Sequence, residues 1–131
     1  KMKVIKINVE TQTIENVTIE NSSKDIYAQI GNGCVLFCIP VQFENGDDLF
    51  ADDESLLREN DIKGGFIMPD WRIPIVGNAV IFGTTWDGDN CDCKTTIENL
   101  KDKVKFLDAK TCQDYAKAAL NGQPFKIIEK L

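Results

Sequence analysis

Apolar and polar residues alternate through the first twenty positions, which is typical of strands with one buried face. The alternation covers residues 3–9 and, after a polar turn, residues 14–19, so we expect an opening hairpin. Ser22 and Ser23 then offer an N-cap for a short helix at residues 25–30. The glycines that follow would end this helix.

The middle of the chain is strand-like. Residues 34–43 are apolar at successive positions, which predicts a central strand buried on both faces. The Asn45-Gly46 pair favours a tight hairpin turn into a short return strand at residues 49–51. Residues 78–82, bracketed by Gly77 and Gly83, predict the next clear strand.

The last third of the chain has helical periodicity. Thr95 and Glu98 form a capping box, and four apolar residues follow at helical spacing: Ile97, Leu100, Val104 and Leu107. A second helix is expected from Thr111, with Asn121 and Gly122 at its end, and a short closing strand at residues 124–128.

This order of elements predicts an α+β fold. We expect a single domain spanning residues 1–131, a length that can bury a core of its own. Its largely antiparallel sheet would carry one short inserted helix, with the two C-terminal helices packed on one face.

Composition narrows the chemistry. The chain has no histidine, which excludes catalytic triads that use His and metal sites that need imidazole. Its 21 acidic and 15 basic residues give a net charge of -6. Nucleic-acid binding requires clustered Lys and Arg, so we expect no direct nucleic-acid binding.

Acidic residues are concentrated between Glu44 and Asp61. We expect a solvated acidic surface there, formed by Asp47, Asp48, Asp52, Asp53 and Glu54. One alternative is mimicry of DNA phosphates. Another is a carboxylate-dependent hydrolase that draws a pair of acids from the same five residues.

The five cysteines do not indicate a metal site. One residue lies between Cys91 and Cys93, whereas structural zinc prefers Cys pairs with two to four residues between them. Asp87 and Asp89 resemble the start of a calcium loop, but the glycine lies at the second position instead of the sixth, so a polar turn is expected. We predict free thiols, no metal and no cofactor.

Two tryptophans lie in segments that we expect to be loops. A bulky aromatic residue in a loop is either folded over the core or used in binding. Arg72 beside Trp71 strengthens the binding interpretation, because Arg recognises carboxylates and phosphates in a bidentate manner. We expect one binding surface with the following residues: Trp71, Arg72, Trp86, Asp87 and Asp89.

Three motifs in the middle of the chain resemble an uncharacterised family of small bacteriophage and mobile-element proteins that carry a domain of unknown function. They are Asp53-Glu54-Ser55-Leu56-Leu57, the Gly-bracketed strand at residues 75–83, and Asp87-Gly88-Asp89. The family has no established activity. The resemblance implies an accessory protein of a phage or mobile element, acting inside a bacterial cell.

We therefore expect a non-catalytic accessory protein that binds and occludes a host protein, in a counter-defence role. The alternatives are a small-molecule sponge with a Trp/Arg-lined pocket, which a homo-oligomer would build at its interface, and the hydrolase. No signal-peptide pattern precedes the first strand, and no apolar stretch approaches the about 20 residues of a membrane helix. These features favour the bacterial cytoplasm and no membrane contact.

Overall fold

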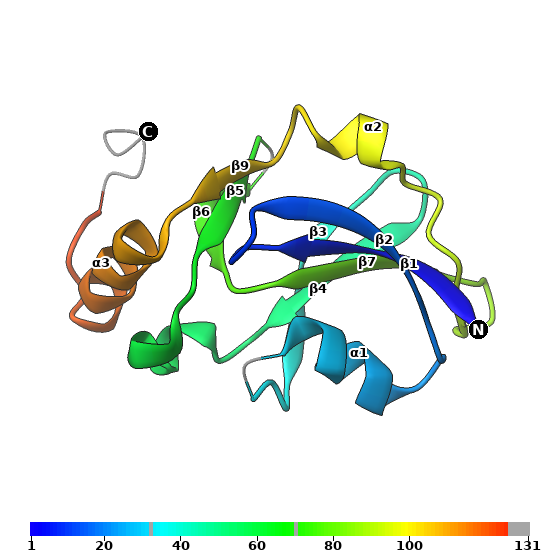
Figure 1. Ribbon diagram of the computed structural model, residues 1–131, viewed down its shortest axis with the longest axis horizontal. Helices are drawn as coiled ribbons and strands as arrows, with labels where there is room; N and C mark the ends of the chain where they lie inside the picture. Colours follow the sequence, from blue (N-terminus) through cyan, green and yellow to red (C-terminus); the bar gives the residue numbers. More distant parts are fainter. Residues whose placement is uncertain (32, 70, 126–131) are drawn as a thin grey trace.

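Two antiparallel sheets and three α-helices make up the described part of the computed structural model, residues 1–31, 33–69 and 71–125 (Figure 1). The larger sheet has the order β2-β1-β7-β4-β3, and β8 also pairs with β7. Its strands are β1 (Met2–Asn8), β2 (Thr13–Ile19), β3 (Phe37–Gln42), β4 (Asp47–Asp52), β7 (Ala79–Thr84) and β8 (Asn90–Cys91).

The smaller sheet has the order β6-β5-β9. Its strands are β5 (Gly65–Met68), β6 (Trp71–Val76) and β9 (Lys105–Leu107). The helices are α1 (Ser23–Ile30), α2 (Ile97–Leu100) and α3 (Ala109–Leu120), with two 3-10 turns, η1 (Ser55–Leu57) and η2 (Glu59–Asp61).

Strand β7 lies at the centre of the larger sheet and is apolar on both faces. Ala79 and Ile81 point to the core shared with the smaller sheet, whereas Val80 and Phe82 point to the core beneath α1. Successive strand residues face opposite sides. A strand covered on both sides therefore has to be apolar where it is covered, as residues 79–82 of β7 are.

Helix α1 covers one face of the larger sheet. The Ser22 side chain accepts a hydrogen bond from the Asp25 backbone N–H, and Gly31 ends the helix with a φ of 71°. Aromatic rings join this helix to the sheet in a continuous row: Tyr27, Phe37, Phe50 and Phe82. Burial of these rings and of Ile26 and Ile30 holds α1 against β4 and β7.

The opposite face of the larger sheet packs against the smaller sheet. This core includes Ile81 and Leu49 of the larger sheet, Phe66 and Ile75 of the smaller one, and Leu100 of α2. A third core, between the smaller sheet and α3, contains Ile62, Val76, Leu107, Cys112 and Ala116. In Figure 1, α1 lies below the larger sheet, α2 above it, and α3 beyond the smaller sheet.

The predicted α+β class and the antiparallel pairing are confirmed. The structure adds two details to this prediction. The strands divide into two sheets, and α2 and α3 pack against different cores. Within the described residues, no helix is long and apolar enough to cross a membrane.

Some element predictions are wrong, among them the loop expected around Trp71, which is the first residue of β6. Residues 34–43 do not form a central strand, since β3 begins at Phe37 and lies at an edge of the larger sheet. The helix expected across residues 95–107 ends at Leu100, and Leu107 belongs to β9, which pairs with β5. A short helix followed by a strand can bury the same apolar residues, so their helical spacing alone does not show that one long helix is present.

The predicted closing strand at residues 124–128 is not tested in full. Pro124 and Phe125 lie in no strand, and residues 126–128 lie outside the described residues.

Candidate functional site

The acidic segment is only partly a surface. Asp47 is 0% exposed and Asp52 is 6% exposed, which corrects the prediction that both belong to a solvated acidic face. They are the first and last residues of β4, where the sheet and its neighbouring loops cover them. Asp53 is exposed, and Asp48 and Glu54 are half-buried.

Asp47 is the centre of a buried hydrogen-bond network. Its Oδ2 accepts hydrogen bonds from the backbone N–H of Lys94 at 2.9 Å, from that of Thr95 at 2.7 Å, and from the Thr95 Oγ1 hydroxyl at 2.6 Å. The Cys93 thiol donates a further bond at 3.3 Å. A single carboxylate oxygen thus joins the start of β4 to residues 93–95.

The second oxygen of Asp47 has no hydrogen-bond partner among the described residues. It faces Gly83 on the neighbouring strand, where a Cβ would lie 3.0 Å from Oδ1 and 3.0 Å from the Cys91 sulfur. A side chain at residue 83 would therefore push these two atoms aside by a few tenths of an ångström, so the close packing favours glycine there.

Asp52 is also committed to structural contacts. Its Oδ1 accepts a hydrogen bond from the Glu54 backbone N–H at 3.0 Å, and its Oδ2 accepts one from the Arg58 guanidinium. Arg58 in turn donates to the Gly33 carbonyl oxygen at 3.3 Å. The hydrolase alternative needs a carboxylate pair that is open to substrate, and neither of these two acids is available for that role.

The cysteines are free thiols. Burial and the hydrogen bond to Asp47 raise the pKa of Cys93 to about 12. Burial, with Asp53 nearby, raises the pKa of Cys38 to about 11, and burial raises the pKa of Cys112 to about 12. These three thiols keep their protons at neutral pH, which makes them poor nucleophiles and poor metal ligands. Across the described residues no group of three or more Cys, Asp or Glu side chains is placed to hold a metal ion.

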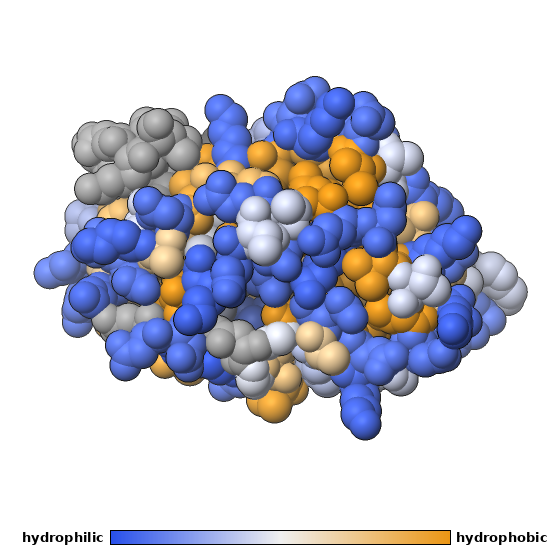
Figure 2. Space-filling model, viewed as in Figure 1, coloured by the Kyte–Doolittle hydropathy of each residue, from blue (hydrophilic) through white to orange (hydrophobic). Residues whose placement is uncertain are grey.

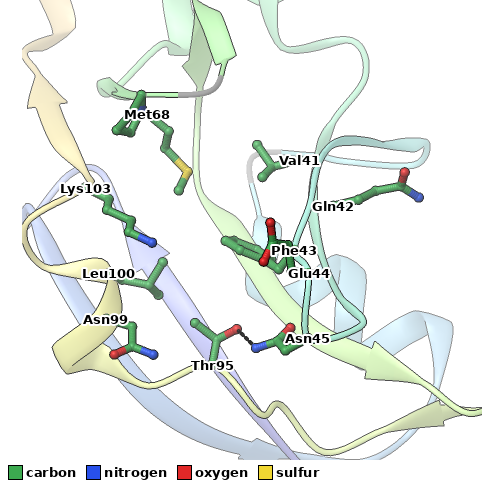
Figure 3. A pocket seen from close by; sticks show the side chains of 11 residues that line it. Val41, Gln42, Phe43, Glu44, Asn45, Met68, Thr95, Asn99, Leu100 and Lys103 are labelled. Atoms are coloured by element: carbon green, nitrogen blue, oxygen red, sulfur yellow. Dashed lines mark hydrogen bonds between the residues drawn. The ribbon is translucent and has the colours of Figure 1, made fainter.

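A pocket of about 400 Å³ lies between the β3–β4 turn and α2 (Figure 3). Met68 and Leu100, both almost fully buried, give it an apolar floor, and Val41 forms part of the wall. At one end, the Asn45 side-chain amide donates a hydrogen bond to Thr95 Oγ1 at 3.0 Å, drawn as the dashed line in Figure 3. Thr95 also donates two hydrogen bonds to Asp47, so the buried network holds in place both the β3–β4 turn and the segment before α2, which form two walls of this pocket.

Opposite charges line the pocket. Figure 3 shows the Lys103 side chain reaching toward the space from the turn after α2, and Glu44 lying across from it on the β3–β4 turn. In the part of the chain that the structure describes, neither side chain forms an ion pair, with the other or with a third group. The pocket therefore offers a cation and an anion to a bound molecule.

Trp86 lies on the tight turn between β7 and β8 and is 98% exposed. Thr85 organises this turn. Its backbone N–H donates to the Asp89 carbonyl oxygen at 2.7 Å, and its Oγ1 accepts from the Asp89 N–H at 3.0 Å and donates to the Asp87 carboxylate. Gly88 completes the turn with a φ of 95°. Asp87 and Asp89 are both exposed beside the indole.

Trp71 belongs to a different environment. It is the first residue of β6, not part of a loop, and its half-buried ring packs against the core that the two sheets share. The whole of β6 and β7 separates Trp71 from Trp86 along the chain, and the Trp86 turn lies beside the N-terminus, away from β6 (Figure 1). The two rings do not form one patch. Arg72 follows in β6, and its side chain lies outside the described part of the structure.

The pocket residues were missed by sequence reasoning. Lys103 and Asn99 lie at polar positions within the segment expected to be one long helix, and Asn45 lies in the expected hairpin turn, so none of them was singled out. These three side chains line one pocket because α2 stops at Leu100, earlier than expected, and because the β3–β4 turn lies next to it.

No family model, no curated protein and no solved structure matches the chain. The resemblance of its motifs to small bacteriophage proteins therefore stays a prediction.

Proposed function

We propose that this protein is a non-catalytic accessory protein of a phage or other mobile element, which binds a host protein and occludes it through the Trp86 turn. The observation that carries the proposal is the position of Trp86, 98% exposed on a turn that is closed by hydrogen bonds between Thr85 and Asp89. An indole exposed to water is a large apolar surface, and Trp is enriched among the residues that dominate binding energy.

The turn is suited to binding because it is held in place before any partner arrives. The hydrogen bonds around Thr85 fix the turn itself. The Asn90 side-chain amide also donates to the Asn21 Oδ1 at 3.1 Å, which ties β8 to the segment before α1. A preorganised loop loses little conformational entropy on binding.

The neighbouring charges indicate the chemistry of the partner surface. Asp87 and Asp89 flank the indole and are both exposed. A complementary partner would present an apolar pocket for the ring with Lys or Arg on its rim, since opposite charges speed association and select the partner. The commitment of Asp47 and Asp52 to internal hydrogen bonds also favours binding over hydrolysis.

A capture experiment tests the proposal. The wild-type chain and Trp86→Ala would each be immobilised and exposed to bacterial lysate, with Leu120→Ala as a matched control that removes another exposed apolar side chain. We expect a protein that the wild type and the Leu120 variant retain and that Trp86→Ala loses. Retention by all three variants, or no specific capture by the wild type, contradicts the proposal.

The two tryptophans should respond differently to truncation. Trp86→Ala should change the free energy of unfolding by no more than about 0.5 kcal/mol, because the exposed ring makes little contact with the core. Trp71→Ala should lower it by about 2 kcal/mol or more, since its ring packs against the core between the sheets. Urea unfolding of both variants measures the difference, and equal losses would show that the burial of these rings has been assigned wrongly.

A further inference from the structure

We infer that the pocket between the β3–β4 turn and α2 binds a small zwitterion with an apolar body, of the class of free apolar amino acids. This site lies outside the Trp86 turn and goes beyond the proposed occlusion of a host protein. None of the pocket's lining residues belongs to that turn.

Charge is the first argument. Lys103 and Glu44 line the same pocket from different elements and form no ion pair with each other. A molecule that carries a carboxylate and an ammonium group can satisfy both at once, with the carboxylate on Lys103 and the ammonium on Glu44. A dianion such as a phosphate ester would meet the negative charge of Glu44, which disfavours it.

The pocket floor is the second argument. Met68 and Leu100 close the bottom of the pocket and are 7% and 1% exposed, whereas Val41 and Phe43, which pack against the same core, are half-buried and present apolar surface to the pocket. An apolar side chain laid on this floor would remove further apolar surface from water. The volume of about 400 Å³ lies in the range of small-molecule sites.

Rigidity is the third argument. The β3–β4 turn and the segment before α2 are fastened to each other through Asn45, Thr95 and the buried carboxylate of Asp47. The Asn45 Oδ1 also accepts a hydrogen bond from the Asp47 backbone N–H at 2.9 Å. Walls fixed in this way do not have to be ordered when a ligand binds, so a modest set of contacts is enough for recognition.

Titration of the full chain with leucine, methionine and phenylalanine tests the inference, with amide NMR shifts as the readout. We expect saturable shifts at residues 43–45 and 99–103. Leucine amide, which lacks the carboxylate, and N-acetyl-leucine, which lacks the ammonium group, should each bind at least about tenfold more weakly than leucine, because each loses one charged contact.

Two variants with matched controls locate the site. Lys103→Met should weaken leucine binding about tenfold and remove the preference for leucine over leucine amide, while Lys101→Met should leave both unchanged. Lys101 is the control because its ammonium already pairs with Glu98 at 2.9 Å, outside the pocket lining. Glu44→Gln and Glu98→Gln form the corresponding pair for the ammonium group.

Three results would overturn the inference. One is the absence of saturable shifts up to about 10 mM amino acid, a concentration that reveals even millimolar sites. Another is saturable binding that maps to residues away from the pocket. The third is an equal effect of the Lys103 and Lys101 variants. None of these results depends on capture of a host protein by the Trp86 turn.

Discussion

Asp47 shows how one buried carboxylate can connect distant parts of this chain. Its Oδ2 accepts hydrogen bonds from two backbone N–H groups and a hydroxyl that lie 47 and 48 residues further along the sequence. A charged group removed from water is tolerated only where donors replace the water. Here the donors come from residues 93–95, so burial of the Asp47 carboxylate requires that this segment folds over the start of β4.

Replacing Asp47 by Ala should lower the free energy of unfolding by about 3 kcal/mol, because four donors lose their acceptor and at least one of them is buried. Urea unfolding measures this loss. Asp102→Ala, which removes an exposed acid, is the control and should stay within about 0.5 kcal/mol of the wild type. Similar losses in the two variants would mean that the network around Asp47 contributes little.

Cys112 predicts a dependence of stability on pH. Burial raises the pKa of this thiol from an ordinary 9.0 to about 12. On raising the pH, the unfolded chain loses the thiol proton first, so the stability present below pH 9.0 declines as the pH rises toward about 12. The decline approaches about 1.4 kcal/mol for each pH unit.

Cys112→Ala isolates this contribution. The variant should be less stable at neutral pH, because the thiol is fully buried and its loss opens a cavity. Its stability should fall less steeply than that of the wild type between about pH 9 and about pH 10.5, since it lacks the titrating group. Urea unfolding across this range gives both slopes, and parallel slopes would rule out the thiol as the cause.

At the scale of the elements, the edge strand β3 is protected against pairing with other chains. Pro40 lies within the strand and has no N–H to offer a neighbour, and the register with β4 shifts between Cys38 and Val41. Prolines and irregularities are common devices for blocking open sheet edges. Protection matters here because Val35, Leu36 and Ile39, in or just before this strand, are exposed.

Pro40→Val should increase self-association, because it restores a backbone donor on an edge that is already apolar. Sedimentation velocity over a range of concentrations measures the effect. Pro124→Ala, which changes an exposed proline outside any strand, is the control and should behave as the wild type does. A monomeric Pro40 variant at all concentrations would show that other features guard this edge.

For the whole molecule, the core between the sheets makes the two sheets depend on each other. Ile81 and Leu49 of the larger sheet share this core with Phe66 and Ile75 of the smaller one. Neither sheet can keep these side chains buried without the other. We therefore expect the described fold to unfold as one cooperative unit.

Trp86→Phe provides the test, because it leaves Trp71, in the core between the sheets, as the single fluorescent tryptophan. The urea transition followed by Trp71 fluorescence should coincide with that followed by far-UV circular dichroism, which reports all helices and strands. Two separated midpoints would show that the sheets unfold independently.

The sequence alone determined the structural features that depend only on residues close together in the chain. The apolar run of β7, the Asn45-Gly46 turn and the Ser22 cap were all recognisable, because strand burial, turn conformation and capping are decided within a few residues. The exposure of the Asp87–Asp89 turn followed in the same way. These local signals were enough for the α+β class and for the antiparallel hairpins.

The tertiary structure alone decided which polar residues are buried and which surfaces meet. Asp47 reads as one more acid in a polar segment, and it becomes a buried anchor only because β4 pairs with β7 and residues 93–95 fold over it. Trp71 joins the core, and Lys103 comes to face Glu44, through contacts between residues far apart in the chain. Such contacts depend on sheet order and packing, and a local pattern of apolar and polar residues contains no information about either.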